Sequence, residues 1–179
     1  MHARREWVTD VLCDRQFFRY YTIYDHLRRA RERLAPMLNV LSETIALIPN
    51  ATSGSNTVLR DYRWQEGDII LALSTVYDAV VKTVEYIQDT HPTPPELRVI
   101  DVTYPIKHDD LVKLVESKLD EIEKKGELKR VKFGWMDSIS SLPGVRVPWE
   151  RLCKLYRQRG ILTFVSCRSY SVAAPEMVC

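Results

Sequence analysis

The sequence lacks the patterns that mark several common classes of protein. No run of about 18 apolar residues is present to span a membrane, and Met1 is followed by charged residues instead of an apolar signal core. The cysteines, Cys13, Cys153, Cys167 and Cys179, show no C-x-x-C spacing and no histidine placed to complete a zinc site. We therefore expect a cytoplasmic protein with reduced thiols, no membrane partner and no metal centre.

An excess of charge of one sign is also missing. Lysine and arginine number 26 against 24 acidic residues, and the net charge of +2 is too small to predict a nucleic-acid partner. A hydrophobic share of 45% with 28% charged residues is, in contrast, typical of folded globular proteins. At 179 residues the chain has the length of one ordinary domain, or of a piece of one.

Helical and strand patterns alternate along most of the chain. Apolar residues at three- and four-residue steps predict one or two amphipathic helices from residue 4 to about residue 35, with a boundary at Pro36. The apolar run at residues 44–48, closed by Pro49, predicts a buried strand, and a short helix is predicted to open at Thr57. Further strands are predicted at 69–73, 97–102, 131–136 and 161–165, and further helices at 76–89, 111–124 (capped by Asp109 and Asp110) and 148–159.

This alternation predicts an α/β fold with a doubly wound, mostly parallel sheet, preceded by the N-terminal helices. Residues 1–40 form the predicted helical segment, and residues 41–165 carry the α/β domain. Residues 166–179 show no periodicity, helix cap or apolar face, so we expect a disordered tail. In a doubly wound sheet ligands bind beyond the carboxyl ends of the strands, where several polar turns of this sequence are expected.

The most informative polar segment is the run of small, hydroxyl-rich residues at 50–57. Small side chains let an anion approach the backbone, the first N–H groups of a helix point toward it, and hydroxyls add hydrogen bonds, so the run is suited to a phosphate. The alternative is that Ser53, Ser55 or Asn56 caps the helix. The run matches neither a Walker loop nor a G-x-G-x-x-G fingerprint, and it therefore predicts no nucleotide site.

Four segments together resemble a known superfamily. NATSGSNTVLR at 50–60, GDII at 67–70, VYDA at 76–79 and DSISSLPG at 137–144 resemble, in order and spacing, the class V aminotransferases, which are fold-type-I enzymes dependent on pyridoxal phosphate. The resemblance covers roughly residues 5–165 and points to the isopenicillin-N-epimerase-like branch, which is related to cysteine desulfurases and C–S lyases. It implies an epimerase, lyase or desulfurase type of reaction on an amino acid or its sulfur derivative, and a possible homodimer.

The resemblance also implies a cofactor site, for pyridoxal 5′-phosphate. It places Ala51, Thr52 and Ser53 at the cofactor phosphate, Tyr77 against the face of the pyridine ring, and Ser141, with its neighbour Ser140 as the alternative, at the phenolic oxygen. Taken alone, Tyr77 also fits an ordinary half-buried tyrosine at a helix start, and the two serines before Pro-Gly fit a common turn.

The sequence departs from the superfamily after Val165. An Asp-Gly-Ala-His-like stretch is expected there, whose aspartate pairs with the pyridine nitrogen, but residues 166–169 read SCRS. The lysine that carries the cofactor lies further on in the superfamily, beyond residue 179. The resemblance therefore implies a truncated enzyme with no catalytic residue and no covalent cofactor attachment in this chain. Two alternatives stay open: a half-enzyme completed by a partner chain, and a non-catalytic α/β module that binds some other phosphorylated ligand.

Overall fold

The computed structural model describes residues 21–167, which fall into two compact units. The first unit runs to Leu47 and the second begins at Ile48. Residues 1–20 of the predicted helical segment and residues 168–179 of the predicted tail lie outside the described residues. The predicted boundaries at residues 40 and 165 stay predictions.

The first unit contains helix α3 (Ile23–Leu38) and the 3₁₀ helix η2 (Ser42–Thr44). α3 confirms an amphipathic helix here, but the predicted boundary at Pro36 is wrong because this proline lies inside the helix. Proline removes one backbone N–H, and since only the last two residues of α3 follow it, the loss is confined to the final turn. Asn39, with a φ of 52°, ends the helix in the left-handed conformation.

The strand predicted at residues 44–48 is also wrong. Thr44 belongs to η2, and the residues after it pair with none of the strands of the described sheet. Leu47 is 42% exposed and Ile48 is 48% exposed, so the run is not buried. A short apolar run carries no periodicity that separates a strand from a loop, and Pro49 offers no N–H for pairing.

Helix α4 (Ala51–Asp61) begins well before its predicted start at Thr57. The polar run at 50–57 is therefore the cap and the first turns of this helix. Serine, threonine, asparagine and glycine have low helix propensity, which is why the run reads as a turn in the sequence. Gly54 in this run approaches the preceding segment closely, because an added Cβ would lie 2.5 Å from Ile48 Cδ1.

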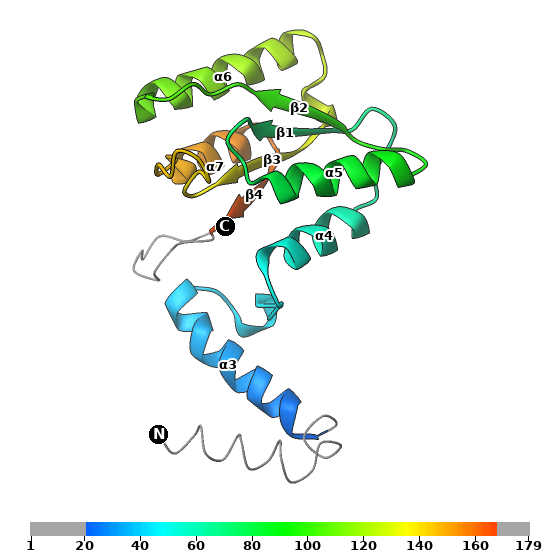
Figure 1. The fold of residues 1–179 in the computed structure, drawn as a ribbon, viewed down its shortest axis with the longest axis vertical. Helices are drawn as coiled ribbons and strands as arrows, with labels where there is room; N and C mark the ends of the chain where they lie inside the picture. The colour runs from blue at the N-terminus through cyan, green and yellow to red at the C-terminus, as the bar shows by residue number, and fades with distance from the viewer. Residues whose placement is uncertain (1–20, 168–179) are drawn as a thin grey trace. The chain divides into compact units, whose positions relative to one another are not determined.

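The rest of the second unit is a four-stranded parallel sheet with helices between its strands (Figure 1). The strand order is β2-β1-β3-β4. The elements are β1 (Ile69–Leu73), α5 (Asp78–Thr90), β2 (Glu96–Ile100), α6 (His108–Lys124), η3 (Leu128–Arg130), β3 (Val131–Asp137), α7 (Trp149–Gln158) and β4 (Leu162–Ser166). The predicted α/β fold with a parallel sheet is confirmed.

Helices cover both faces of this sheet. On one face lies a buried cluster of residues from α4, α5, β1 and β3 with Trp64: Leu59, Trp64, Ile70, Ala72, Val80, Val84, Ile87, Phe133 and Trp135. Because side chains alternate along a strand, Gly134 faces the other side, where an added Cβ would lie 2.7 Å from the ring of Tyr156 in α7. Burial raises the pKa of Tyr156. The edge strand β4 is joined to β3 by the stacked rings of Trp135 and Phe164, whose centroids are 3.8 Å apart.

The start of α6 differs from the prediction in its cap. Lys107 is the N-cap residue, and Asp109 and Asp110 lie in the first turn of the helix. Acidic side chains in a first turn still stabilise a helix, because they face the positive end of its dipole. The two aspartates therefore lie at the helix start, as predicted, but the prediction that they cap the helix is wrong.

An ion-pair cluster around Arg98 joins β2 to the segment that enters β3. The Arg98 guanidinium donates to two carboxylates. Its Nη1 lies 2.7 Å from Oε2 of Glu127, and its Nε lies 2.7 Å from Oε1 of Glu96. These bonds lower the pKa of Glu96 and of Glu127 and raise the pKa of Arg98. Arg130 Nε donates to the carbonyl of Gly67 at 2.6 Å, which closes the turn before β1. We assign this cluster to stability.

Candidate functional site

The amino end of α4 gathers the predicted phosphate-binding residues in one helical turn. Asn50 is the N-cap, and its side-chain Oδ1 accepts the N–H of Ser53 at 2.8 Å. A cap is present, as one interpretation of the sequence had it, but at Asn50 and not at the residues proposed. Because the first N–H groups of a helix have no partner within it, those of Ala51 and Thr52 are the donors directed at the space before α4.

Tyr77 is the N-cap residue of α5 and is half-buried. It follows the turn at the carboxyl end of β1. Its backbone N–H donates to Asp137 Oδ2 at 2.9 Å. Asp137 is the last residue of β3 and is 5% exposed. Tyr77 is therefore fixed to the carboxyl end of a neighbouring strand.

Thr52 and Tyr77 line one pocket of about 470 Å³ in the second unit. The other lining residues come from α4 and α5: Asn56, Asp78, Ala79, Lys82, Thr83 and Tyr86. The structure thus brings together two of the five residues predicted to bind the cofactor. Ala51 and Ser53 flank Thr52 in the same helical turn, whereas Ser141 is not among the residues that line this pocket.

Two polar side chains with no predicted role in binding hold α4 against α5 beside the pocket. Asn56 Nδ2 donates to Thr83 Oγ1 at 3.1 Å and to the carbonyl of Thr52 at 3.0 Å. Thr83 Oγ1 donates to the carbonyl of Ala79 at 2.8 Å, and Thr83 is 5% exposed. A signal for Thr83 exists in the sequence, because it interrupts the apolar stripe of α5, and a polar group at a buried position needs a partner.

A positively charged side chain, Lys82, also lines this pocket. The Lys82 ammonium lies 2.8 Å from a Glu85 carboxylate oxygen, and this bond raises the pKa of Lys82, which is therefore protonated at neutral pH. Asp78, one turn earlier on α5, contributes a carboxylate to the pocket lining. The guanidinium carbon of Arg60, in α4, lies 4.8 Å from the centroid of the ring of Tyr86, one of the lining residues.

The serine pair after β3 forms a turn, and its two members differ. Ser140 is 2% exposed, and its hydroxyl accepts the N–H of Val145 at 3.1 Å. Ser141 is exposed at the surface of this turn. The hydroxyl of Ser140 is therefore used within the turn, and Ser141 stays the predicted contact to the cofactor.

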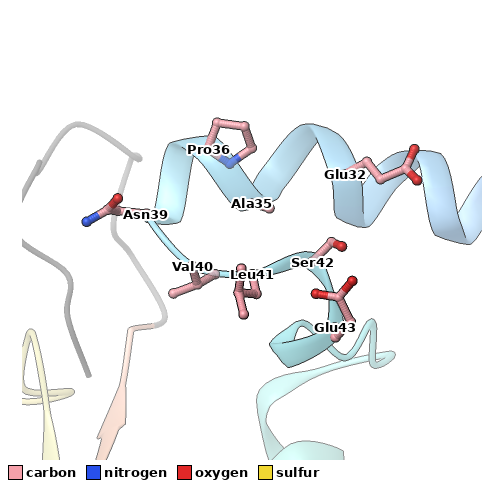
Figure 2. Close-up of a pocket in the computed structure, with 8 residues that line it drawn as sticks. All are labelled: Glu32, Ala35, Pro36, Asn39, Val40, Leu41, Ser42 and Glu43. Atoms are coloured by element: carbon pink, nitrogen blue, oxygen red, sulfur yellow. The ribbon is translucent and has the colours of Figure 1, made fainter.

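Figure 2 shows a second pocket, which lies in the first unit, at the end of α3 and in the turn that follows. Its lining residues are Glu32, Ala35, Pro36, Asn39, Val40, Leu41, Ser42 and Glu43. Glu32 is already paired with Arg28, whose Nη1 lies 2.7 Å from its Oε1. None of the predicted site residues lines this pocket, so we place the candidate site at Thr52 and Tyr77.

Within residues 21–167, no helix is long and apolar enough to cross a membrane. In the same part of the chain, no group of three or more histidine, cysteine, aspartate and glutamate side chains is arranged to hold a metal ion.

Comparison with known proteins bears on this site. No protein-family model matches the chain. The chain is 29% identical over 139 residues to an L-cysteine desulfhydrase-like protein of Epichloe uncinata. The aligned residues make up 78% of this chain and 30% of that protein. It is 26% identical over 140 residues to the hercynylcysteine sulfoxide lyase of Schizosaccharomyces pombe. This alignment covers 78% of this chain and 33% of the lyase. The chain therefore spans about a third of the length of the curated relatives it matches.

Solved structures share the fold. A cystine C–S lyase in complex with its product cysteine persulfide matches with a TM-score of 0.68 and 18% identity, over 82% of this chain and 38% of the lyase. A mutant of this lyase carries glycine covalently linked to its pyridoxal-phosphate cofactor. A cysteine desulfurase of Escherichia coli matches with a TM-score of 0.59 and 19% identity, over 80% and 34% of the two chains.

These comparisons confirm the resemblance to fold-type-I enzymes of the class V aminotransferase type that the sequence motifs indicated. The relatives found by sequence are cysteine desulfhydrase-like and sulfoxide lyase proteins, and those found by structure, a cystine C–S lyase and a cysteine desulfurase, share the fold. Pyridoxal phosphate, the cofactor that the resemblance implied, is the cofactor of the C–S lyase among these structures.

Proposed function

We propose that this chain forms the phosphate-binding and ring-binding part of a pyridoxal-phosphate site, in a protein whose substrate is cysteine or another sulfur-containing amino acid. One observation carries the proposal: Thr52 and Tyr77, on different helices, line the same pocket. Their convergence supports a ligand that has both an anionic group and an aromatic ring. The sulfur chemistry of the substrate rests on the relatives alone.

The residues of the pocket fit this cofactor. The N–H groups of Ala51 and Thr52 and the Thr52 hydroxyl are donors for a phosphate, at the positive end of α4. Lys82 shares the pocket with Thr52, and its ammonium, which pairs with Glu85, adds positive charge beside the Asp78 carboxylate. The Tyr77 ring offers an apolar face for the pyridine ring. When bound, the cofactor supplies an electron sink for amino-acid chemistry, and this chain supplies the surface that orients it.

We also propose that this polypeptide alone is catalytically incompetent. Ser166 ends β4, where the resembled superfamily continues into the aspartate that pairs with the pyridine nitrogen. A serine hydroxyl is neutral and does not stabilise a protonated ring nitrogen as a carboxylate does. Production of sulfide from L-cysteine by the purified chain with added pyridoxal phosphate would contradict this part of the proposal.

Binding of pyridoxine 5′-phosphate tests the site itself. This compound has the phosphate and the ring but no aldehyde, so it does not react with surface lysines. We expect Thr52→Val to weaken its binding by roughly tenfold or more, as the loss of one hydrogen bond to a charged group implies. Thr57→Val is the matched control, because its hydroxyl donates to the carbonyl of Ser53 within α4 and lies outside the pocket lining.

The outcome of this titration, followed by ³¹P NMR, separates the candidate functions. Equal binding of pyridoxine 5′-phosphate and inorganic phosphate would refute a cofactor site and support a general phosphate-binding module. Equal losses in the two threonine variants would refute the role of the Thr52 turn.

A further inference from the structure

Hydrogen bonds continue the pairing of neighbouring strands beyond the strand ends. Ser74 Oγ, after β1, accepts the N–H of Val102, after β2, at 2.9 Å. The N–H of Ser138, after β3, donates to the carbonyl of Ser166 at the end of β4, also at 2.9 Å. The third bond joins β3 to the turn after β1, from the N–H of Tyr77 to Asp137 Oδ2. Of these three bonds, the last alone uses a carboxylate and reaches a residue that lines the candidate pocket.

Tyr77 needs such a contact because its own side chain does not cap α5. It occupies the N-cap position in an extended conformation and makes no side-chain cap bond. Tyrosine is not a favoured N-cap residue, and the N–H of an N-cap residue is not part of the helix ladder. Asp137 supplies a side-chain oxygen acceptor from the end of a buried strand.

Burial makes this contact rigid. Asp137 is 5% exposed, and the register places it beside Ser166 of β4. Its carboxylate is therefore held by the sheet, and it holds the Cα of Tyr77, from which the ring projects. The phosphate-binding turn does not depend on this contact, because Asn50 and the Asn56–Thr83 bond hold the start of α4.

We propose that Asp137 is the positioning residue for the Tyr77 ring, and that it selects ligands carrying a flat ring next to the phosphate. This inference rests on the proposed function, whose ring-binding half it explains. Asp137 acts through the Tyr77 backbone and not by touching the ligand. Loss of its carboxylate removes ring recognition and leaves phosphate recognition in place.

The test uses the full chain, with pyridoxine 5′-phosphate and inorganic phosphate as probes. We expect Asp137→Ala to weaken binding of pyridoxine 5′-phosphate by roughly twofold to tenfold, the range of one aromatic stack, and to leave inorganic phosphate unchanged. Hydrogen exchange of the Tyr77 amide should become faster in this variant. Asp137→Asn keeps an oxygen acceptor and should retain both the slow exchange and the affinity. Ser74→Ala is the control, because it removes a strand-end bond of the other strand pair.

A double-mutant cycle separates positioning from general loss of structure. In a Tyr77→Ala background, Asp137→Ala should have no further effect on binding, because the ring it positions is gone. Additive losses overturn the proposal, as does a Tyr77 amide that exchanges equally fast with and without Asp137. Asp137→Asn binding as weakly as Asp137→Ala, with slow exchange kept, overturns it in favour of a direct charge effect. Asp137→Ser replaces the alanine variant if that variant does not fold. Failure of the wild type to bind pyridoxine 5′-phosphate refutes the proposed function, and the exchange comparison still decides what Asp137 does.

Discussion

Substitution of Asn50 is expected to separate the stability of α4 from its affinity for an anion. The Asn50 side chain caps the helix through one bond of 2.8 Å to the Ser53 N–H. Asn50→Ala removes this exposed cap, which costs about 1 kcal/mol of unfolding free energy. For a chain of this length, that loss lowers the Tm by about 3 °C. The helix should persist, because Leu59 remains buried against α5 and the sheet.

Asn50→Asp is the informative partner of this variant. Its carboxylate still accepts the Ser53 N–H and adds a negative charge at the positive end of α4, so stability should stay equal or rise by about 0.5 kcal/mol. The same charge stands next to the N–H groups of Ala51 and Thr52, which we propose as phosphate donors. Repulsion between two charges about 6 Å apart costs about 0.7 kcal/mol in bulk water and about 3 kcal/mol at the effective dielectric constant near a protein surface. We therefore expect the affinity for pyridoxine 5′-phosphate to fall by roughly threefold to hundredfold.

The assay combines thermal unfolding by circular dichroism with ligand titration at low ionic strength. In Asn50→Ala the stability falls, and in Asn50→Asp the affinity falls while the stability does not. Raising the salt concentration should reduce the affinity loss of the aspartate variant, because exposed charges are screened. Unchanged affinity in Asn50→Asp at low salt would refute an anion site at this helix end.

Two further predictions concern the core and the ion-pair cluster. Gly134→Ala places a Cβ 2.7 Å from the Tyr156 ring and should cost about 1 to 3 kcal/mol, measured by urea unfolding against Gly126→Ala, which has open space but a φ of 73°. Glu96 and Glu127 have lowered pKa values in the folded chain, so their contribution to stability is complete above their ordinary pKa of 4.5 and is lost as the pH falls below it. When the pH is lowered from about 5 to about 3, the unfolding free energy of Arg98→Gln should therefore fall by less than that of the wild type. An equal fall in both proteins would contradict the assignment of this cluster to stability.

The central strands β1 and β3 of the parallel sheet were predictable because they are buried on both faces. β1 is buried at all five positions, and such continuous apolar runs between helical stripes are the strongest local signal for a parallel strand. The run at 44–48 has the same composition without a partner strand, and composition alone does not distinguish the two. The prediction that a helix ends at Pro36 was wrong for a similar reason. The free-energy cost of a proline in a helix depends on how many residues of the helix follow it, and the local sequence does not show that number.

The proposed phosphate-binding turn and the position of Tyr77 differ in how far the sequence predicts them. The turn at Thr52 is a local feature, in which small residues, a capping asparagine and a helix start occur together in sequence. The position of Tyr77 relative to it depends on the packing of α4 against α5, which the periodicity of either helix alone does not specify. Only the resemblance to a family joined the two residues before the structure did.

The contact between Asp137 and Tyr77 could not be predicted from the sequence. It lies within a motif that marked the resemblance, yet its partner Tyr77 is distant in the chain and follows a different strand. The two meet because β1 and β3 are neighbours, although β2 comes between them in sequence. Strand order is set by which crossover helix covers which face, and local patterns do not encode that choice. A residue that acts through such a non-local contact is therefore visible only in the folded chain, which is why the exchange rate of the Tyr77 amide is the direct measure of its role.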